Sequence, residues 1–210
     1  ASLRGRPSPE GFAVFALGKL GGLELNYSSD VDLLLCCRDS DAADELRFFT
    51  RLGERLIQAL SQKGPEGFLC RVDMRLRPLG ETGALVPTFS SLVNYYESWS
   101  EAWERQALIK TRFVAGATDL ASRFQDFVAR FTFARQLDDA SLEEIKRVKH
   151  RSEKKYASRG QDAFDLKKGT GGIRDIEFYV QYHQLIAGWR CPEARSSNTL
   201  QAIQGLAQTK

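Results

Sequence analysis

Two aspartates separated by one residue, Asp30 and Asp32, stand at the start of an apolar segment that runs to Cys37. Residues i and i+2 of a β-strand point to the same face, so both carboxylates are expected to converge. Asp73 lies in another strand-like segment and would join them if the two strands are neighbours. Carboxylates this close repel one another unless a cation lies among them, and oxygen-only ligands suit Mg²⁺, which also binds substrate phosphates. The pattern indicates phosphoryl or nucleotidyl transfer. A D-x-D pair by itself, however, is also common at turns, where it has no catalytic role.

A glycine-rich turn precedes these aspartates. Gly18-Lys-Leu-Gly-Gly22 directly follows the apolar run Phe12–Leu17. Such a turn leaves backbone N–H groups available to phosphate, and a following helix N-terminus adds positive potential. Ser28 and Ser29 come just before the first aspartate and can donate to phosphate oxygens. Neither the GxxxxGK[ST] nor the GxGxxG pattern is present, which excludes a P-loop enzyme and a dinucleotide-binding Rossmann domain.

Composition narrows the class of protein. The 210 residues carry 30 Lys+Arg against 27 Asp+Glu, a net charge of +3, which does not support bulk binding of nucleic acid. The apolar runs are far shorter than the roughly 20 residues that cross a bilayer. Four cysteines show no zinc spacing, so we expect free thiols in a reducing cytoplasm. The only methionine is Met74, so we expect the chain to be an excerpt of a longer protein.

Periodicity predicts the elements that position these side chains. Continuous apolar runs predict buried strands over 12–17 and 31–37, and apolar residues at helical spacing predict a helix over 43–62. Alternation predicts a third strand over 68–77 with Arg71, Asp73, Arg75 and Arg77 on one face. That charged face either meets water or lines a site.

The second half of the sequence is helical in pattern. We expect a helix capped by Ser90 or Ser91. Further helices are expected over 101–110, 119–133, 141–157 and 173–187, and another opens in the last dozen residues. The chain is therefore predicted to change from mixed α and β structure to all-α structure near residue 115.

The order of strand, Gly-Lys turn, short helix, D-x-D strand and third aspartate resembles the nucleotidyltransferase fold of the DNA polymerase β superfamily. The resemblance implies an α+β fold with a small mixed sheet. It assigns residues 1–115 to a nucleotidyltransferase catalytic domain and residues 116–210 to a helical domain that is truncated at its C-terminus.

Four ordered blocks resemble the glutamine synthetase adenylyltransferases: 18–33, Arg71-Val-Asp-Met-Arg-Leu-Arg-Pro78 with Glu81-Thr-Gly83, 103–112 and 171–178. That family carries two related halves. One attaches AMP from ATP to a tyrosine of glutamine synthetase, and the other removes it by phosphorolysis, with phosphate consumed and ADP released. The residues around Met74 and Arg174 resemble the removing half more closely.

The resemblance implies roles for particular residues. Mg²⁺ would be held by Asp30, Asp32 and Asp73. Phosphate or nucleotide would be contacted by Gly18, Lys19, Ser28, Ser29, Arg75, Arg77 and Lys167. ATP or ADP and phosphate are the implied substrates, glutamine synthetase and a PII signalling protein the implied partners, and the cytoplasm the implied location. No nucleic-acid or membrane partner is expected. The alternatives are the adenylylating half, a non-catalytic nucleotide-sensing module and, less favoured, a nucleic-acid polymerase or tailing enzyme.

Overall fold

The computed structural model describes residues 10–133, 137–157, 165–167 and 169–208. It divides into two compact units, one formed by residues 1–100 and 110–128 and the other by residues 101–109 and 129–210. The first contains a small mixed sheet and the second is helical, which confirms the predicted fold class. The predicted domain boundary between residues 115 and 116 stays a prediction.

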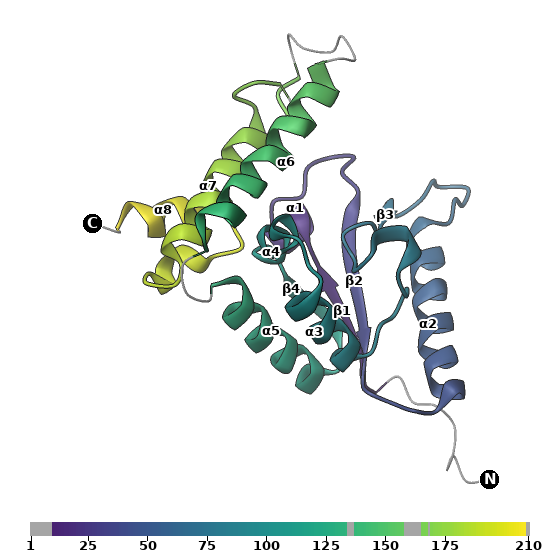
Figure 1. Cartoon of the computed structure of the whole chain (residues 1–210). Helices are drawn as coiled ribbons and strands as arrows, with labels where there is room; N and C mark the ends of the chain where they lie inside the picture. The colour runs from purple at the N-terminus through teal and green to yellow at the C-terminus, as the bar shows by residue number, and fades with distance from the viewer. Residues whose placement is uncertain (1–9, 134–136, 158–164, 168, 209–210) are drawn as a thin grey trace, which may run out of the picture. The chain divides into compact units, whose positions relative to one another are not determined.

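The sheet of the first unit has the strand order β3-β2-β1-β4 (Figure 1). Strand β1 (Phe12–Ala16) is antiparallel to β2 (Val31–Cys37) on one side and to β4 (Arg112–Gly116) on the other. Strand β3 (Val72–Asp73) runs parallel to β2. The two predicted apolar strands, β1 and β2, are thus confirmed as the centre of the sheet.

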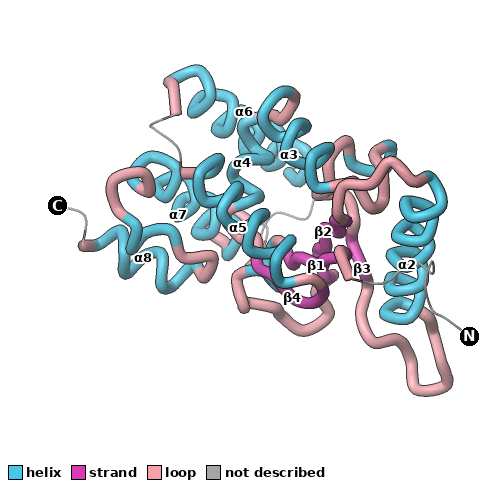
Figure 2. Tube along the Cα trace, turned by 90° about the horizontal axis from the view of Figure 1, so that it is seen from below, coloured by secondary structure: helices cyan, strands magenta, loops and turns pink. Residues whose placement is uncertain are grey.

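Helices cover both faces of this sheet, with α2 (Ala43–Ser61) on one side and α5 (Thr118–Thr132) on the other (Figures 1 and 2). Leu33 and Leu35 belong to one buried cluster with Phe49 of α2. On the opposite face, the ring of Phe15 lies 4.7 Å from that of Phe124 in α5. Burial on both faces explains why these strands read as continuous apolar runs rather than as alternating ones.

Two details of the first unit differ from the sequence prediction. The strand predicted over 68–77 is only Val72–Asp73, because the chain turns directly after Asp73 and a short 3₁₀ helix, η1 (Gly80–Thr82), follows. Strand β4 lies between the helices predicted over 101–110 and 119–133, where no strand was predicted, and it forms because its backbone pairs with β1.

Helix α3 (Phe89–Ser98) is capped two or three residues earlier than predicted. Thr88 is the N-cap residue, and its hydroxyl accepts the backbone N–H of Ser91 at 3.3 Å. The prediction of Ser90 or Ser91 as the cap was therefore wrong. Any Ser or Thr can satisfy a free N–H at a helix start, so sequence alone did not separate the three.

The second unit contains α4 (Ala102–Leu108), α6 (Asp139–Ala157), α7 (Ile173–Ala187), the 3₁₀ helix η2 (Pro192–Arg195) and α8 (Thr199–Ala207). Its buried cluster is built from Ile109, Phe133, Leu142, Ile145 and Leu185, among others. These helices confirm the predicted helical pattern. In the residues described, none of the helices has the length and apolar character that crossing a membrane requires.

Candidate active site

The second aspartate of the D-x-D pair and the third aspartate are neighbours in the sheet. The parallel pairing of β2 with β3 places Asp32 opposite Asp73 and Val31 opposite Val72. The backbone N–H of Val31 donates to the carbonyl oxygen of Arg71 at 2.8 Å, which is a hydrogen bond of this parallel ladder. Neighbouring strands in a sheet lie about 4.8 Å apart. The two strands are therefore neighbours, as the convergence of the three acids requires.

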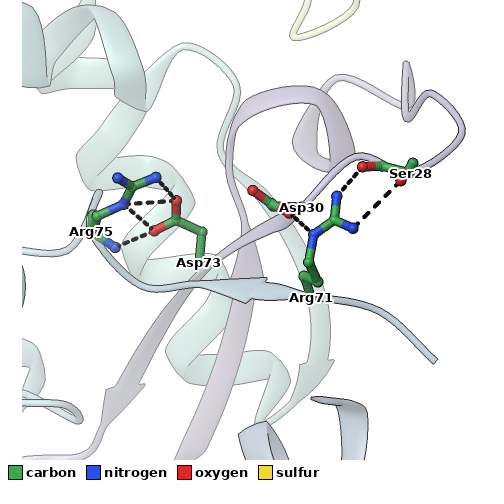
Figure 3. Close-up of polar contacts among 5 residues, drawn as sticks. All are labelled: Ser28, Asp30, Arg71, Asp73 and Arg75. Carbon is green, nitrogen blue, oxygen red and sulfur yellow. Dashed lines mark hydrogen bonds and ion pairs between the residues drawn. The ribbon is translucent and has the colours of Figure 1, made fainter. Parts of the chain in front are cut away.

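Two arginines that flank β3 bind the carboxylates of Asp30 and Asp73 (Figure 3). The guanidinium of Arg71 donates to Asp30 at 2.5 Å and also to the backbone carbonyl of Ser28. Ser28 has a φ of +58°, a left-handed conformation that is uncommon for a residue other than glycine. Arg71, which directly precedes β3, therefore connects β3 to the loop before β2.

Arg75 forms a closer arrangement with Asp73. Its side chain donates to both carboxylate oxygens, with Nε at 3.0 Å from one and 2.9 Å from the other, and its backbone N–H donates at 2.8 Å. The side-chain hydrogen bond from Arg75 is the main reason that the pKa of Asp73 is lowered. Because the Asp73 carboxylate captures the N–H two residues on, the chain turns there and the strand ends.

The residues fit a magnesium site in their chemistry and backbone placement. Carboxylate oxygens are the ligands that Mg²⁺ prefers, and the register brings two of the three acids side by side. Within the described ranges, however, no group of three acidic, histidine or cysteine side chains is arranged to hold a metal ion. Asp30 and Asp73 are instead each held by an arginine. The predicted binding of Mg²⁺ by all three aspartates stays a prediction.

The glycine-rich turn lies directly against the second aspartate. It forms the short helix α1 (Gly18–Gly21) between β1 and β2, and Gly18 has a φ of +51°. A Cβ atom built on Gly18 would lie 2.4 Å from Oδ2 of Asp32, closer than any real contact. Glycine is thus required here for its backbone conformation and for the space that the carboxylate occupies.

The other predicted binding residues are found in three places. Lys19 of α1 donates to the side chain of Asn26 at 3.0 Å. Arg77 donates to the backbone carbonyls of Met74 at 2.8 Å and Glu81 at 3.2 Å, so it stabilises the turn after β3. Lys167 belongs to the second unit, in the segment before α7. The predicted contacts of these residues with phosphate or nucleotide stay predictions, as do those of Ser29.

Three charged residues around α1 received no role from the sequence: Glu24, Lys110 and Arg112. Lys110 is only 4% exposed and forms an ion pair with Glu24. Arg112 donates to two backbone carbonyls of α1. Lys110 and Arg112 both lie in the third block that resembles the family, between residues 103 and 112, and that block was the signal that could have pointed to them.

A separate cavity of about 860 Å³ lies within the second unit, between α6, α7 and α8. Apolar and aromatic side chains line most of it, and the rings of His183 and Tyr179 are tilted toward each other with centroids 4.4 Å apart. Both lysines on its wall already have acidic partners: Lys146 pairs with Glu143, and Lys149 pairs with Glu153 and Asp175. None of the predicted site residues lines this cavity.

A small mixed sheet that carries a Gly-Lys turn, a D-x-D strand and a parallel strand with a third aspartate defines a nucleotidyltransferase domain. The family model of glutamate-ammonia ligase adenylyltransferase matches residues 3–127, more than half of the chain. The chain belongs to that family. The model of GlnD PII-uridylyltransferase matches residues 139–210, where the fourth block lies. Both are nucleotidyltransferase families, so the protein is an enzyme of the nucleotidyltransferase class.

Proposed function

We propose that this chain catalyses Mg²⁺-dependent nucleotidyl transfer on glutamine synthetase, in the direction that removes AMP from the adenylylated tyrosine. The observation that carries the proposal is the placement of Asp32 beside Asp73, with Gly18 against the Asp32 carboxylate. This placement brings the acidic residues next to the turn that is expected to hold phosphates. The family supports the transfer and the relation to glutamine synthetase.

In the proposed reaction an oxygen of inorganic phosphate attacks the phosphorus of the tyrosyl-AMP linkage. The bond from phosphorus to the tyrosine oxygen breaks, ADP leaves, and the tyrosine oxygen takes up a proton. Asp30, Asp32 and Asp73 would hold Mg²⁺, which would supply positive charge against the phosphoryl oxygens. The turn at Gly18 and Lys19 orients the phosphates.

The direction of transfer is supported by the arginines next to the acids. In phosphorolysis the attacking group is itself an anion, and it must approach a site that contains three carboxylates. Arg75 is largely exposed beside Asp73, and its planar guanidinium matches phosphate in a two-bond geometry. The resemblance of Arg71-Val-Asp-Met-Arg75 and of the segment at Arg174 to the removing half agrees with this direction.

The test supplies the chain with adenylylated glutamine synthetase, phosphate and Mg²⁺ and measures ADP. Release of ADP supports removal. A parallel assay supplies ATP and the unmodified synthetase. AMP transfer in that assay, without phosphorolysis in the first, would show that the proposed direction of transfer is wrong. Nucleotide binding with neither reaction would instead indicate a sensing module. Salt-dependent affinity for RNA or DNA would favour a polymerase or tailing enzyme.

A double substitution separates the acids from the fold. Asp30→Asn with Asp32→Asn should abolish turnover and leave the melting temperature close to that of the unchanged chain. Asp44→Asn is the matched control, because it makes the same change on a residue of α2 that is 90% exposed and paired with Arg47. Unchanged turnover in the double variant would remove these carboxylates from the mechanism.

The proposed partners and cellular location follow from the proposed substrate. We propose glutamine synthetase as the macromolecular substrate and a PII signalling protein as a further partner, in the cytoplasm. The match of residues 139–210 to the PII-uridylyltransferase model supports the second partner only as a relation between families. A pull-down of each purified protein by this chain, with and without ATP, tests both partners.

A further inference from the structure

The short helix α1 is held from outside by side chains that come from far along the sequence. Arg112, the first residue of β4, donates from Nη2 to the carbonyl oxygen of Leu20 at 2.8 Å and from Nε to that of Gly21 at 3.2 Å. These carbonyls lie at the C-terminal end of α1. A guanidinium is well placed there, because its charge is favourable near a helix C-terminus and its two parallel donors fix an orientation.

The loop that leaves α1 is held by a second long-range contact. The ammonium of Lys110 is 4% exposed and donates to the carboxylate of Glu24 at 2.5 Å. The Glu24 side chain is itself only 18% exposed. Breaking a buried pair by removing one partner leaves an uncompensated charge, so the pair strongly restrains the loop between α1 and β2.

The backbone around Lys110 also leaves no space beside the turn. A Cβ atom built on Gly21 would lie 1.7 Å from the carbonyl oxygen of Lys110. At the other end of the same short helix, Gly18 touches the Asp32 carboxylate. A displacement of α1 away from Arg112 therefore also changes the space around Asp32.

We propose that Lys110 and Arg112 are positioning residues for nucleotidyl transfer: they set the place of the Gly18–Gly21 turn relative to Asp32 and so fix the phosphates against the acids. This inference rests on the proposed function for its catalytic consequence. The physical coupling of Arg112 to the turn does not depend on it. Neither side chain needs to touch the substrate.

Hydrogen exchange tests the coupling directly. The amides of Gly21, Gly22 and Glu24 donate to carbonyls within the turn. In Arg112→Ala they should exchange at least about 10-fold faster, because the turn loses its external restraint. Amides of α2 should be unchanged in the same variant. Arg47→Ala, which loses an exposed pair on α2, is the control and should leave the turn unchanged.

Substrate binding and turnover test the consequence. Arg112→Ala should weaken ADP binding in the presence of Mg²⁺, measured by calorimetry, and should lower kcat/KM by about 10- to 100-fold, the loss that a misplacement of about 1 Å produces. Arg112→Lys should recover part of both, because an ammonium reaches one carbonyl but not two. Glu24→Gln should act in the same direction through Lys110.

The outcomes distinguish this inference from the proposed function. If the turn amides exchange at the original rate in Arg112→Ala, or if ADP affinity and kcat/KM stay within about 2-fold while exchange accelerates, the positioning role is wrong. If Arg112→Ala does not fold, Arg112→Lys and Glu24→Gln decide by the same measurements. If the unchanged chain binds ADP but catalyses neither direction of transfer, the proposed function fails, while exchange and ADP affinity still decide the role of Arg112.

Discussion

Replacing Gly18 by alanine should damage the site far more than the fold. The added Cβ atom would lie 2.4 Å from Oδ2 of Asp32, whereas Cβ atoms keep at least 3.0 Å from other heavy atoms, so the carboxylate or the turn must move by about 0.6 Å. A left-handed backbone adds about 1–2 kcal/mol for alanine, and the stiffer unfolded chain returns about 0.4–1 kcal/mol of this. The backbone conformation alone therefore costs about 1 kcal/mol, or about 2–4 °C in melting temperature, and the overlap with Asp32 adds up to about 1–3 kcal/mol of overpacking.

The activity of Gly18→Ala should fall even though the variant stays folded. A displacement of about 0.6 Å in an acid that is proposed to hold Mg²⁺ corresponds to about a 10-fold or greater loss of kcat/KM. Gly67→Ala is the control, because Gly67 has a φ of +104° but no atom within 4 Å of its Cβ position. Urea denaturation gives the stability of both variants, and ADP release gives the activity. Equal losses of activity in the two variants, or full activity in Gly18→Ala, would refute the steric reasoning.

Further substitutions and pH test other parts of the molecule. Gly21→Ala places a Cβ atom 1.7 Å from a backbone oxygen, so it should lower the free energy of unfolding by more than about 3 kcal/mol, the upper end of ordinary overpacking. In Gly53→Ala the added Cβ meets only side chains, so thermal melting should show a loss of about 1–3 kcal/mol. Thr88→Ala removes the cap of α3 and should lower the free energy of unfolding in urea by about 1 kcal/mol. Burial raises the pKa of Cys37 from 9.0 to about 11 and raises that of Cys36 further, so the unfolded thiols ionise first and stability should fall as pH rises from 9 to 11. The slope is at most about 1.4 kcal/mol per pH unit for each thiol, and the double variant C36A/C37A should flatten it in urea denaturation.

Much of the fold was predictable because burial leaves a simple pattern in the sequence. Strands β1 and β2 are covered on both faces, and their continuous apolar runs identified them. Strand β4 was missed because Arg112-Phe-Val-Ala-Gly116 is short and partly exposed, so its pairing with β1 has no signature within the segment itself. The alternation after Arg71 predicted too long a strand, because the capture of the Arg75 N–H by Asp73 is not visible in a polarity pattern.

The site was predictable in its residue types and less so in its contacts. The spacing of Asp30 and Asp32 predicts a common face, which stays a prediction, whereas the parallel register places Asp73 opposite Asp32. The pairing of Asp30 with Arg71 joins residues 41 positions apart, and no local pattern specifies it. Contacts of this kind depend on which strands become neighbours, and that is a property of the whole sheet.

The contact between Glu24 and Lys110 spans 86 positions of the chain, so the glycine-rich turn is not an autonomous motif. During synthesis the whole acidic motif emerges long before the lysine that anchors the turn. Contacts of such long range form late, because the intervening chain must first be closed into a loop. A fragment that stops before residue 110 would also lack Arg112 and the edge strand beside β1. We therefore expect that a fragment able to assemble the proposed site has to extend through Gly116, even though the Gly-Lys turn and the D-x-D pair end at Asp32 and the third aspartate is Asp73.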